Sequence, residues 1–419
     1  MTEPHVHISA SPHIHSKKSK SIQEIMLYVI IALLPTTIWG IVAFGYKAVI
    51  VVLLSVFVSV LTEFLIDKFI KKDISSLKDL SAIVTGMLVG LNLSSEVPLY
   101  IPIIASVFAI AVCKMSFGGI GQNIANPAIG GRLFVMFSFT SAMGNYAVPR
   151  FLRGLESVPL MSAATSMATS SATSIATSSA TSMASSATVA VTSATTSSAT
   201  ISSQLLLSGA TPLSYVKALP ESGLSAIKAL ESAGYPFTGF AEKVGSALHI
   251  SPYYVDAFIG NISGCIGEVS AFLLIIGGIF LLIKKVISYH IPLSYLLTFG
   301  IFTWLFGGIP QGLGMFHGDA FWGIITGGVI LGSLFMATDM VTTPITHKGQ
   351  VIFGIGCGFL TFFFRTFASL SEGASIAILM MNIATPLIDK YTHPRVMGTP
   401  YRGFSAKFHN RSKSTEVTK

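Results

Sequence analysis

The sequence predicts an all-α polytopic membrane protein with about ten transmembrane helices. Of its 419 residues, 51% are hydrophobic and only 11% are charged, and the mean hydropathy is +0.71. This composition lies outside the range of soluble globular proteins. Several apolar segments approach the roughly 20 residues with which a helix crosses the hydrocarbon core, and a helix satisfies its own backbone donors and acceptors there.

Ten apolar segments can be placed in order along the chain. Residues 1–24 form a polar tail with three lysines directly before the first segment, so we expect no cleavable signal peptide. A first membrane half covers 25–141 and a second covers 256–389. The expected spans are 25–45, 47–66, 79–95, 99–114, 123–141, 256–283, 291–309, 319–337, 350–366 and 373–389.

Basic residues predict the orientation, because short loops rich in Lys and Arg remain cytoplasmic. The ten-span topology puts the following basic residues on one side: Lys68, Lys71, Lys72, Lys78, Lys114, Lys284, Lys285, Lys348, Lys390 and Arg395. Both tails, 1–24 and 390–419, are therefore expected in the cytoplasm. The loop 142–255 is expected to face outward. The net charge of +8 then reflects orientation and attraction to membrane lipid, and gives no argument for nucleic acid.

The outward loop holds a low-complexity Ser/Thr/Ala insert at about 161–203. Five successive Ala-Thr-Ser-x tetrapeptides run from Ala164 to Met183. Small polar residues bury too little apolar surface to offset the entropy of ordering, so we expect disorder or marginal helix here. Tandem tetrapeptides of this kind also arise by slippage during replication.

The two membrane halves show a short internal similarity. Ile83-Val84-Thr85-Gly86 in the third span resembles Ile324-Ile325-Thr326-Gly327 in the eighth. The two spans run in opposite directions in the predicted topology, which indicates a five-plus-five inverted repeat. Such repeats place polar sites near the bilayer midplane, often beside broken helices.

Ionisable and amide side chains within the spans are candidate pathway residues, since polar groups at membrane depth are costly. Glu268 lies about a dozen residues into the sixth span, and Asp319 and Asp339 lie near opposite ends of the eighth. Asn123 and Asn126 lie at the start of the fifth span, where either a broken helix or an ordinary helix start with Pro127 fits. Carboxylates at span ends can equally be solvated. The sequence shows no metal-ligand spacing and no disulfide framework around Cys113, Cys265 and Cys357.

Six motifs occur in order along the chain: Ser11-Pro12-His13, Gly118 to Ala128, Ser208 to Leu213, Gly264 to Glu268, Met336 to Asp339 and Tyr391 to Val396. Together they resemble a family of respiratory membrane proteins. The family comprises the RnfD subunit of the Rnf ferredoxin:NAD oxidoreductase and the NqrB subunit of the sodium-translocating NADH:quinone oxidoreductase. We favour the first of these, because the chain has a short Ser-Pro-His start.

The resemblance implies an FMN joined through a phosphoester to a threonine by a separate flavin transferase. The matching residue is Thr211, within Ser208, Gly209 and Ala210 of the same motif. It also implies partner subunits of an Rnf-type complex and electron flow coupled to movement of Na⁺ or H⁺. The acidic residue that many members carry six positions before the threonine is Leu205 here. Ser-Ser-Ala-Thr runs in the insert imitate the motif core, ending at Thr173, Thr181, Thr188 and Thr200.

The resemblance thus favours a subunit of an ion-translocating oxidoreductase, without a complete active site of its own. FMN would relay electrons, and Thr211 would be an anchor and not a catalytic residue. Glu268, Asn123, Asn126, Asp319 and Asp339 are candidates for an ion pathway or for a second, noncovalent flavin. A flavin-free solute channel or transporter on an inverted repeat is the alternative from another class, and a scaffold whose flavin site has decayed is a third.

Overall fold

The computed structural model describes residues 20–71, 79–152, 211–217, 224–232, 234–368 and 373–392. Within these ranges every regular element is a helix, and one isolated antiparallel β-bridge joins Ala147 to Gly264. The all-α class is therefore confirmed. The tail before Lys20, the insert 161–203 and the tail beyond Thr392 lie outside the described residues.

The first half begins with two long helices that meet at Gly45. The Ser21 side chain caps the first helix by accepting the Glu24 backbone N–H at 3.1 Å. Gly45 has φ +86°, and a side chain there would overlap the Arg150 guanidinium. The elements of this half are α1 (Ile22–Phe44), α2 (Tyr46–Ile66), the π-helix η1 (Asp67–Lys71), α3 (Ser81–Leu91), α4 (Tyr100–Val107), the π-helix η3 (Phe108–Met115), α5 (Pro127–Ser138) and α6 (Thr140–Met143).

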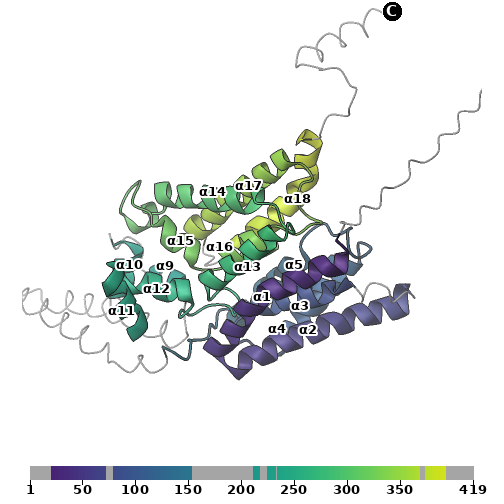
Figure 1. The fold of residues 1–419 in the computed structure, drawn as a ribbon, viewed down its shortest axis with the longest axis horizontal. Coiled ribbons are helices and arrows are strands. Elements are labelled where there is room, and N and C mark those ends of the chain that lie inside the picture. The colour runs from purple at the N-terminus through teal and green to yellow at the C-terminus, as the bar shows by residue number, and fades with distance from the viewer. Residues whose placement is uncertain are drawn as a thin grey trace, which may run out of the picture.

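Four short helices lie at one end of the long helices (Figure 1). They are α9 (Pro212–Lys217), α10 (Ala226–Ser232), α11 (Gly239–Leu248) and α12 (Pro252–Ile259). We call this end the loop face, and the opposite end, where α1 begins and α18 ends, the terminal face. The second half contains α13 (Ala271–Ile283), α14 (His290–Phe306), the 3₁₀ helix η4 (Ile309–Gln311), α15 (Ala320–Ile325), α16 (Val329–Leu331), the π-helix η5 (Gly332–Met336), α17 (His347–Phe367) and α18 (Ala374–Thr392).

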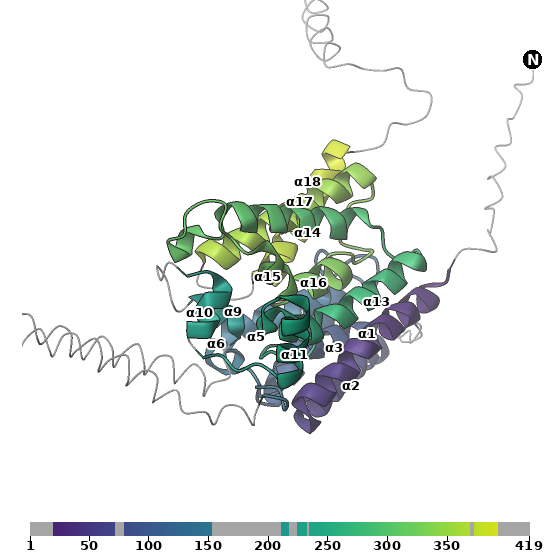
Figure 2. The same ribbon diagram turned by 60° about the vertical axis from the view of Figure 1, so that its left-hand side comes forward.

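Within each of the two halves, corresponding helices contact one another in a similar order. α2 packs against α3, α4 and η3, and α14 packs in the same way against α15 and α17. α5 lies on α4 and η3 as α18 lies on α17. The halves join through α1 with α13 and through α5 with α18 (Figure 2). The side chain of Tyr28, near the start of α1, meets Phe280 near the end of α13, so these two helices run antiparallel.

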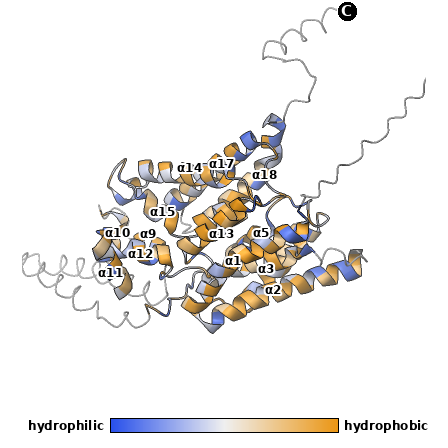
Figure 3. Ribbon diagram, viewed as in Figure 1, coloured by the Kyte–Doolittle hydropathy of each residue, from blue (hydrophilic) through white to orange (hydrophobic). Residues whose placement is uncertain are grey.

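Hydrophobic residues, orange in Figure 3, make up most of the long helices, and many of them are exposed on the helix surface. Ile38, Leu53 and Phe57 are large and exposed on α1 and α2, as expected for helices whose surroundings are hydrocarbon. In the described ranges, four helices are long and apolar enough to cross a membrane: Ile22–Phe44, Tyr46–Ile70, His290–Gln311 and His347–Phe367. The polytopic membrane class is confirmed, and the count of ten spans is not.

The sixth predicted span, 256–283, is wrong as a continuous helix. α12 ends at Ile259 and is capped by Gly260, which has φ +112°. α13 begins only after its N-cap residue, Ser270. The intervening backbone pairs with the end of α3. Gly267 N–H donates to Leu91 O at 2.7 Å, and Ile266 N–H donates to Leu93 O, just after α3, at 3.0 Å. Glycine and small polar residues permit this break, and the pairing satisfies backbone groups that hydrocarbon cannot.

The third and eighth predicted spans are also shorter than expected. α3 ends at Leu91, and the eighth span is broken between α15 and α16 at Gly327, which has φ +56°. Gly86 and Gly90 leave no room for a side chain, since a Cβ would come within 2.6 Å of Val56 on α2 at the first and within 2.9 Å of Val52 at the second. These glycines allow close packing of α3 on α2.

Candidate functional site

Thr211 lies directly before α9 and is 6% exposed. Its Oγ1 accepts the Ser214 backbone N–H at 3.2 Å and donates to Ser214 Oγ at 3.0 Å. This is the hydrogen bonding of a helix N-cap, followed by Pro212 at the first helical position. Ser208, Gly209 and Ala210 lie outside the described residues. The Thr211 hydroxyl is therefore in the protein interior and not in a solvated turn.

A small cavity brings Thr211 together with Glu268. Its volume is about 10 Å³, which is room for about one water molecule. The breaks in the sixth and eighth spans meet the start of α9 here. The lining residues are Thr211, Pro212, Leu213, Ile262, Ser263, Gly264, Glu268, Val269, Thr326 and Gly327.

Glu268 forms a buried ion pair with Arg132. Arg132 Nη1 donates to Glu268 Oε1 at 3.1 Å, to Asn92 Oδ1 at 2.6 Å and to Ser375 Oγ at 3.2 Å. Buried charges are tolerated only when they are paired and hydrogen-bonded. Arg132 and Asn92 belong to the first half, and Glu268 and Ser375 belong to the second. The ion pair therefore joins the two halves in the interior.

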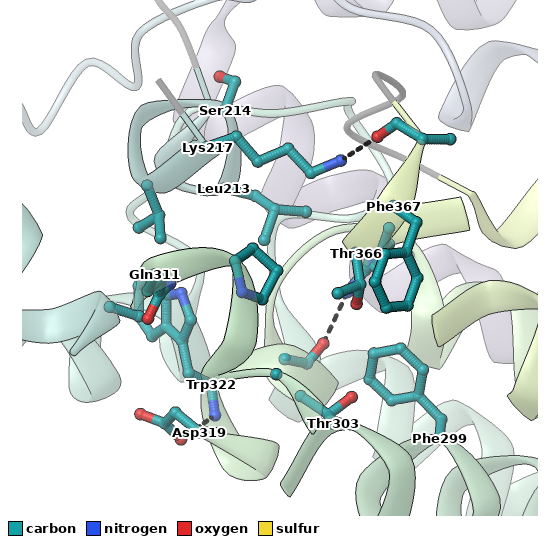
Figure 4. A pocket seen from close by; sticks show the side chains of 17 residues that line it. Leu213, Ser214, Lys217, Phe299, Thr303, Gln311, Asp319, Trp322, Thr366 and Phe367 are labelled. Carbon is teal, nitrogen blue, oxygen red and sulfur yellow. Dashed lines mark hydrogen bonds between the residues drawn. The ribbon is translucent and has the colours of Figure 1, made fainter. Parts of the chain in front are cut away.

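A larger cavity of about 700 Å³ lies beside Thr211 on the loop face (Figure 4). Leu213 and Ser214, which follow Thr211 in the chain, form part of its wall. The volume falls in the usual range of small-molecule and cofactor sites. The other lining residues are Val216, Lys217, Ala226, Phe299, Thr303, Gly307, Pro310, Gln311, Asp319, Trp322, Gly323, Arg365, Thr366, Phe367 and Ala368.

Two basic side chains line this cavity. Lys217 Nζ donates to Ala368 O at 3.0 Å. Burial, and secondly the charge of Arg365, lower the pKa of Lys217 to about 8. Arg365 donates from Nη1 to Gly323 O at 2.8 Å and from Nη2 to Thr326 O at 3.0 Å. These carbonyls lie at the end of α15, where the helix dipole favours a cation.

The wall of the large cavity also holds polar groups with different roles. Trp322 Nε1 and Thr303 Oγ1 are buried, and neither finds a hydrogen-bond partner among the described residues. Asp319 instead caps α15, accepting the Trp322 backbone N–H at 2.9 Å and the Tyr254 hydroxyl. Trp322 and Thr303 thus place two unpartnered polar groups within the cavity wall, while the Asp319 carboxylate is held by the protein.

Asn123, Asn126 and Asp339 line a third cavity, of about 100 Å³, toward the terminal face. The Asn126 side chain caps α5, accepting a backbone N–H at 3.0 Å, and its Nδ2 donates to Met336 O at 3.1 Å. Pro127 is the first residue of α5, so this segment is an ordinary helix start and not a broken helix. Asn123 Oδ1 is buried without a hydrogen-bond partner in the described part of the chain.

Several functional or buried charged residues lie where the sequence did not predict them. Lys114 was expected in a basic loop, but its Nζ is buried, donating to Glu63 Oε2 and Ser81 Oγ at 2.6 Å each. Arg132 was not singled out, although a charge inside the apolar run of α5 is itself a signal. Lys217 and Trp322 lack any such sequence signal, because only the fold brings them beside Thr211.

Comparison with known proteins gives one consistent result. The profile of the NQR2, RnfD, RnfE family matches residues 7–398. The chain is 36% identical over 400 residues to the RnfD subunit of the Na(+)-translocating ferredoxin:NAD(+) oxidoreductase complex of Acetobacterium woodii, covering 95% of this chain and 97% of that protein.

Two further relatives match over comparable lengths. The corresponding subunit of the proton-translocating ferredoxin:NAD(+) oxidoreductase complex of Clostridium ljungdahlii is 35% identical, covering 94% of this chain and 96% of that protein. That of the ion-translocating oxidoreductase complex of Stutzerimonas stutzeri is 33% identical, with 91% and 94% covered. On these matches, the chain belongs to the NQR2, RnfD, RnfE family.

Proposed function

We propose that this chain is the RnfD subunit of an Rnf-type, ion-translocating ferredoxin:NAD oxidoreductase, and that it carries FMN as a phosphoester on Thr211. The observation that carries the proposal is the position of Thr211. Its buried hydroxyl directly precedes residues that line a cavity of about 700 Å³ with basic side chains on its wall. The names of the relatives support membership of such a complex.

The large cavity fits a flavin by volume and by chemistry. Lys217 and Arg365 favour an anionic ligand. Trp322 and Phe299 line the cavity and supply aromatic surface against which a flavin ring packs. When bound, FMN would supply one-electron relay, while these side chains hold and orient it and exclude water.

The proposed role requires partners and a defined orientation. No nicotinamide site or cluster-ligand set is evident in the sequence, so other subunits of the complex would supply both, and a flavin transferase would attach the FMN. We place the chain in a bacterial inner membrane with both termini cytoplasmic. The loop face, with Thr211 and the large cavity, would then face outward.

Ion movement through this subunit is supported by the cavity toward the terminal face. Its volume of about 100 Å³ is well below the usual range for organic ligands. Asn123, Asn126 and Asp339 therefore fit an ion pathway better than a second flavin, with Glu268 as the next carboxylate toward the loop face. Asp319 fits a structural role at the start of α15 better than either.

Intact-mass analysis and in-gel flavin fluorescence test the proposal. The chain would be co-expressed with a flavin transferase as wild type, as Thr211→Val and as the matched control Thr200→Val. We expect a covalent FMN in the wild type and in the control, and none in Thr211→Val. A wild type without flavin would instead support a flavin-free channel or transporter. Assembly with quinone-reductase partners would support the sodium-translocating NADH:quinone oxidoreductase.

A further inference from the structure

Asn382, on α18, is a buried amide that the protein leaves unsatisfied. Its side chain is 1% exposed. Neither Oδ1 nor Nδ2 has a hydrogen-bond partner in the part of the chain that the structure describes. An unpaired amide is costly in an apolar interior and more so within a membrane. A ligand or water that supplies both kinds of partner would remove this penalty.

Asn382 lies in a row of polar residues on one face of α18. Ser375, Asn382 and Thr385 are all buried, and their spacing of seven and three residues puts them on the same side of the helix. Ile378 shares this face and lies against Gly332 in η5. A Cβ added to Gly332 would lie 3.3 Å from Ile378 Cδ1. The row therefore faces the interior of the second half.

Each end of this row is connected, through one intermediate residue, to a carboxylate of the candidate ion pathway. Ser375 Oγ accepts from Arg132, which holds Glu268. At the other end, Thr385 Oγ1 donates to Thr342 O at 2.9 Å, and Thr342 Oγ1 lies 3.4 Å from Asp339 Oδ2.

The polar row spans the region between two cavities. Asp339 lines the cavity toward the terminal face, and Glu268 lines the small cavity that contains Thr211. Asn382 lies on α18 between Ser375 and Thr385, whose hydrogen bonds lead toward these two carboxylates. It is seven residues from Ser375, which is roughly 10 Å along a helix axis.

We propose that Asn382 is a transit site for a Na⁺ ion that keeps part of its water. The amide Oδ1 would coordinate the cation, and Nδ2 would donate to a water bound to that cation, so one hydrated ion satisfies both unpartnered atoms. The Asp339 carboxylate favours entry of a cation at one end of the row. At the other end Glu268, which is paired with Arg132, is the next carboxylate toward the loop face. The proposal rests on the ion-translocating part of the proposed function, and not on the flavin.

Uptake of ²²Na⁺ by proteoliposomes that contain the whole complex tests this site. Ferredoxin-driven NAD reduction would be measured in parallel, with wild type, Asn382→Leu, Asn382→Ser and the lipid-facing control Ile383→Val. We expect Asn382→Leu to lower the Na⁺ taken up per NADH about tenfold. Asn382→Ser keeps an oxygen ligand and should raise the half-saturating Na⁺ concentration while retaining uptake. The control should match the wild type.

Two results would overturn the proposal. One is a Na⁺ uptake ratio and a Na⁺ dependence unchanged in both Asn382 variants, which would mean that the amide holds water alone. The other is wild-type transport that does not depend on Na⁺. If Asn382→Leu fails to assemble, an Asn382→Ser complex indistinguishable from wild type assigns Asn382 a structural role. The covalent flavin, measured by mass in the same samples, reports separately on Thr211.

Discussion

Arg365 and Lys217 line the same cavity but differ in how firmly each holds its charge. An arginine stays protonated at any accessible pH, and Arg365 is fixed by two carbonyls of the α15 segment. Lys217 has a pKa of about 8, lowered by burial and then by Arg365. The first residue should therefore give the cavity a permanent positive charge, and the second a charge that depends on pH.

Replacing Arg365 by Gln should make the bound flavin harder to reduce. Reduction adds negative charge, and a buried cation nearby stabilises it more strongly than in water. We expect a tenfold or greater fall in the reduction equilibrium constant, or about 59 mV for one electron. Potentiometric titration of the flavin absorbance measures it, with Lys228→Gln as control. An unchanged potential at full flavin content would contradict this role.

Anion binding in the large cavity should weaken as pH rises through about 8. Lys217 is charged below its lowered pKa and neutral above it, so its attraction for an anion is present at pH 7 and lost by pH 9. Fluorescence titration of free FMN into Thr211→Val protein measures this. The Thr211→Val/Lys217→Gln protein should bind more weakly at pH 7 and show little pH dependence. If FMN binding showed the same pH dependence with and without Lys217, another titrating group would be responsible for that dependence.

At the scale of elements, long apolar runs predicted the helices, and hydropathy could not predict the breaks. α1, α2 and α17 begin and end within a few residues of the expected spans, because each is built around a long apolar run. The sixth and eighth spans contain glycines, whose effect is not visible in a hydropathy averaged over the whole span. Gly260 and Gly327 interrupt them with positive φ, and tertiary partners satisfy the freed backbone groups.

The break in the eighth span should depend on Gly327. Its φ of +56° is unfavourable for alanine, and a Cβ would come within 2.6 Å of Arg365 Nη2. We expect Gly327→Ala to lower the free energy of unfolding by about 1–2 kcal/mol and to reduce covalent flavin content. Thermal unfolding in detergent tests this against Gly239→Ala, where no described atom lies within 4 Å of the added Cβ. Equal melting temperatures for the two variants would refute it.

At the scale of the whole molecule, the two halves meet around one buried ion pair. Glu268 could be singled out from the sequence as a carboxylate at membrane depth, but its pairing with Arg132 could not. Arg132 is 136 residues away in the chain, and Thr211 reaches the same region through a separate loop. Contacts between residues so far apart in the sequence depend on how the two halves pack together. Neither hydropathy nor a local motif predicts that packing.

Breaking the Arg132 and Glu268 pair should destabilise the assembly of the halves. Arg132→Met and Glu268→Met each leave an uncompensated buried charge, so each should lower the free energy of unfolding by about 3–5 kcal/mol. The double variant should lose less than the sum. Denaturant unfolding in detergent measures the cycle, with Lys47→Met, in a pair 47% and 33% exposed, as a control expected within about 1 kcal/mol. Additive losses would rule out a direct pairing.

The central claim is that Thr211 carries the flavin, and peptide mapping by mass spectrometry tests it most directly. The insert offers competing threonines in Thr173, Thr181, Thr188 and Thr200, so a whole-protein mass alone does not locate the modification. We predict that the FMN mass resides on the peptide containing Thr211 and that fragment ions assign it to that residue. An FMN assigned to any threonine of the insert, with Thr211 unmodified, would contradict the account.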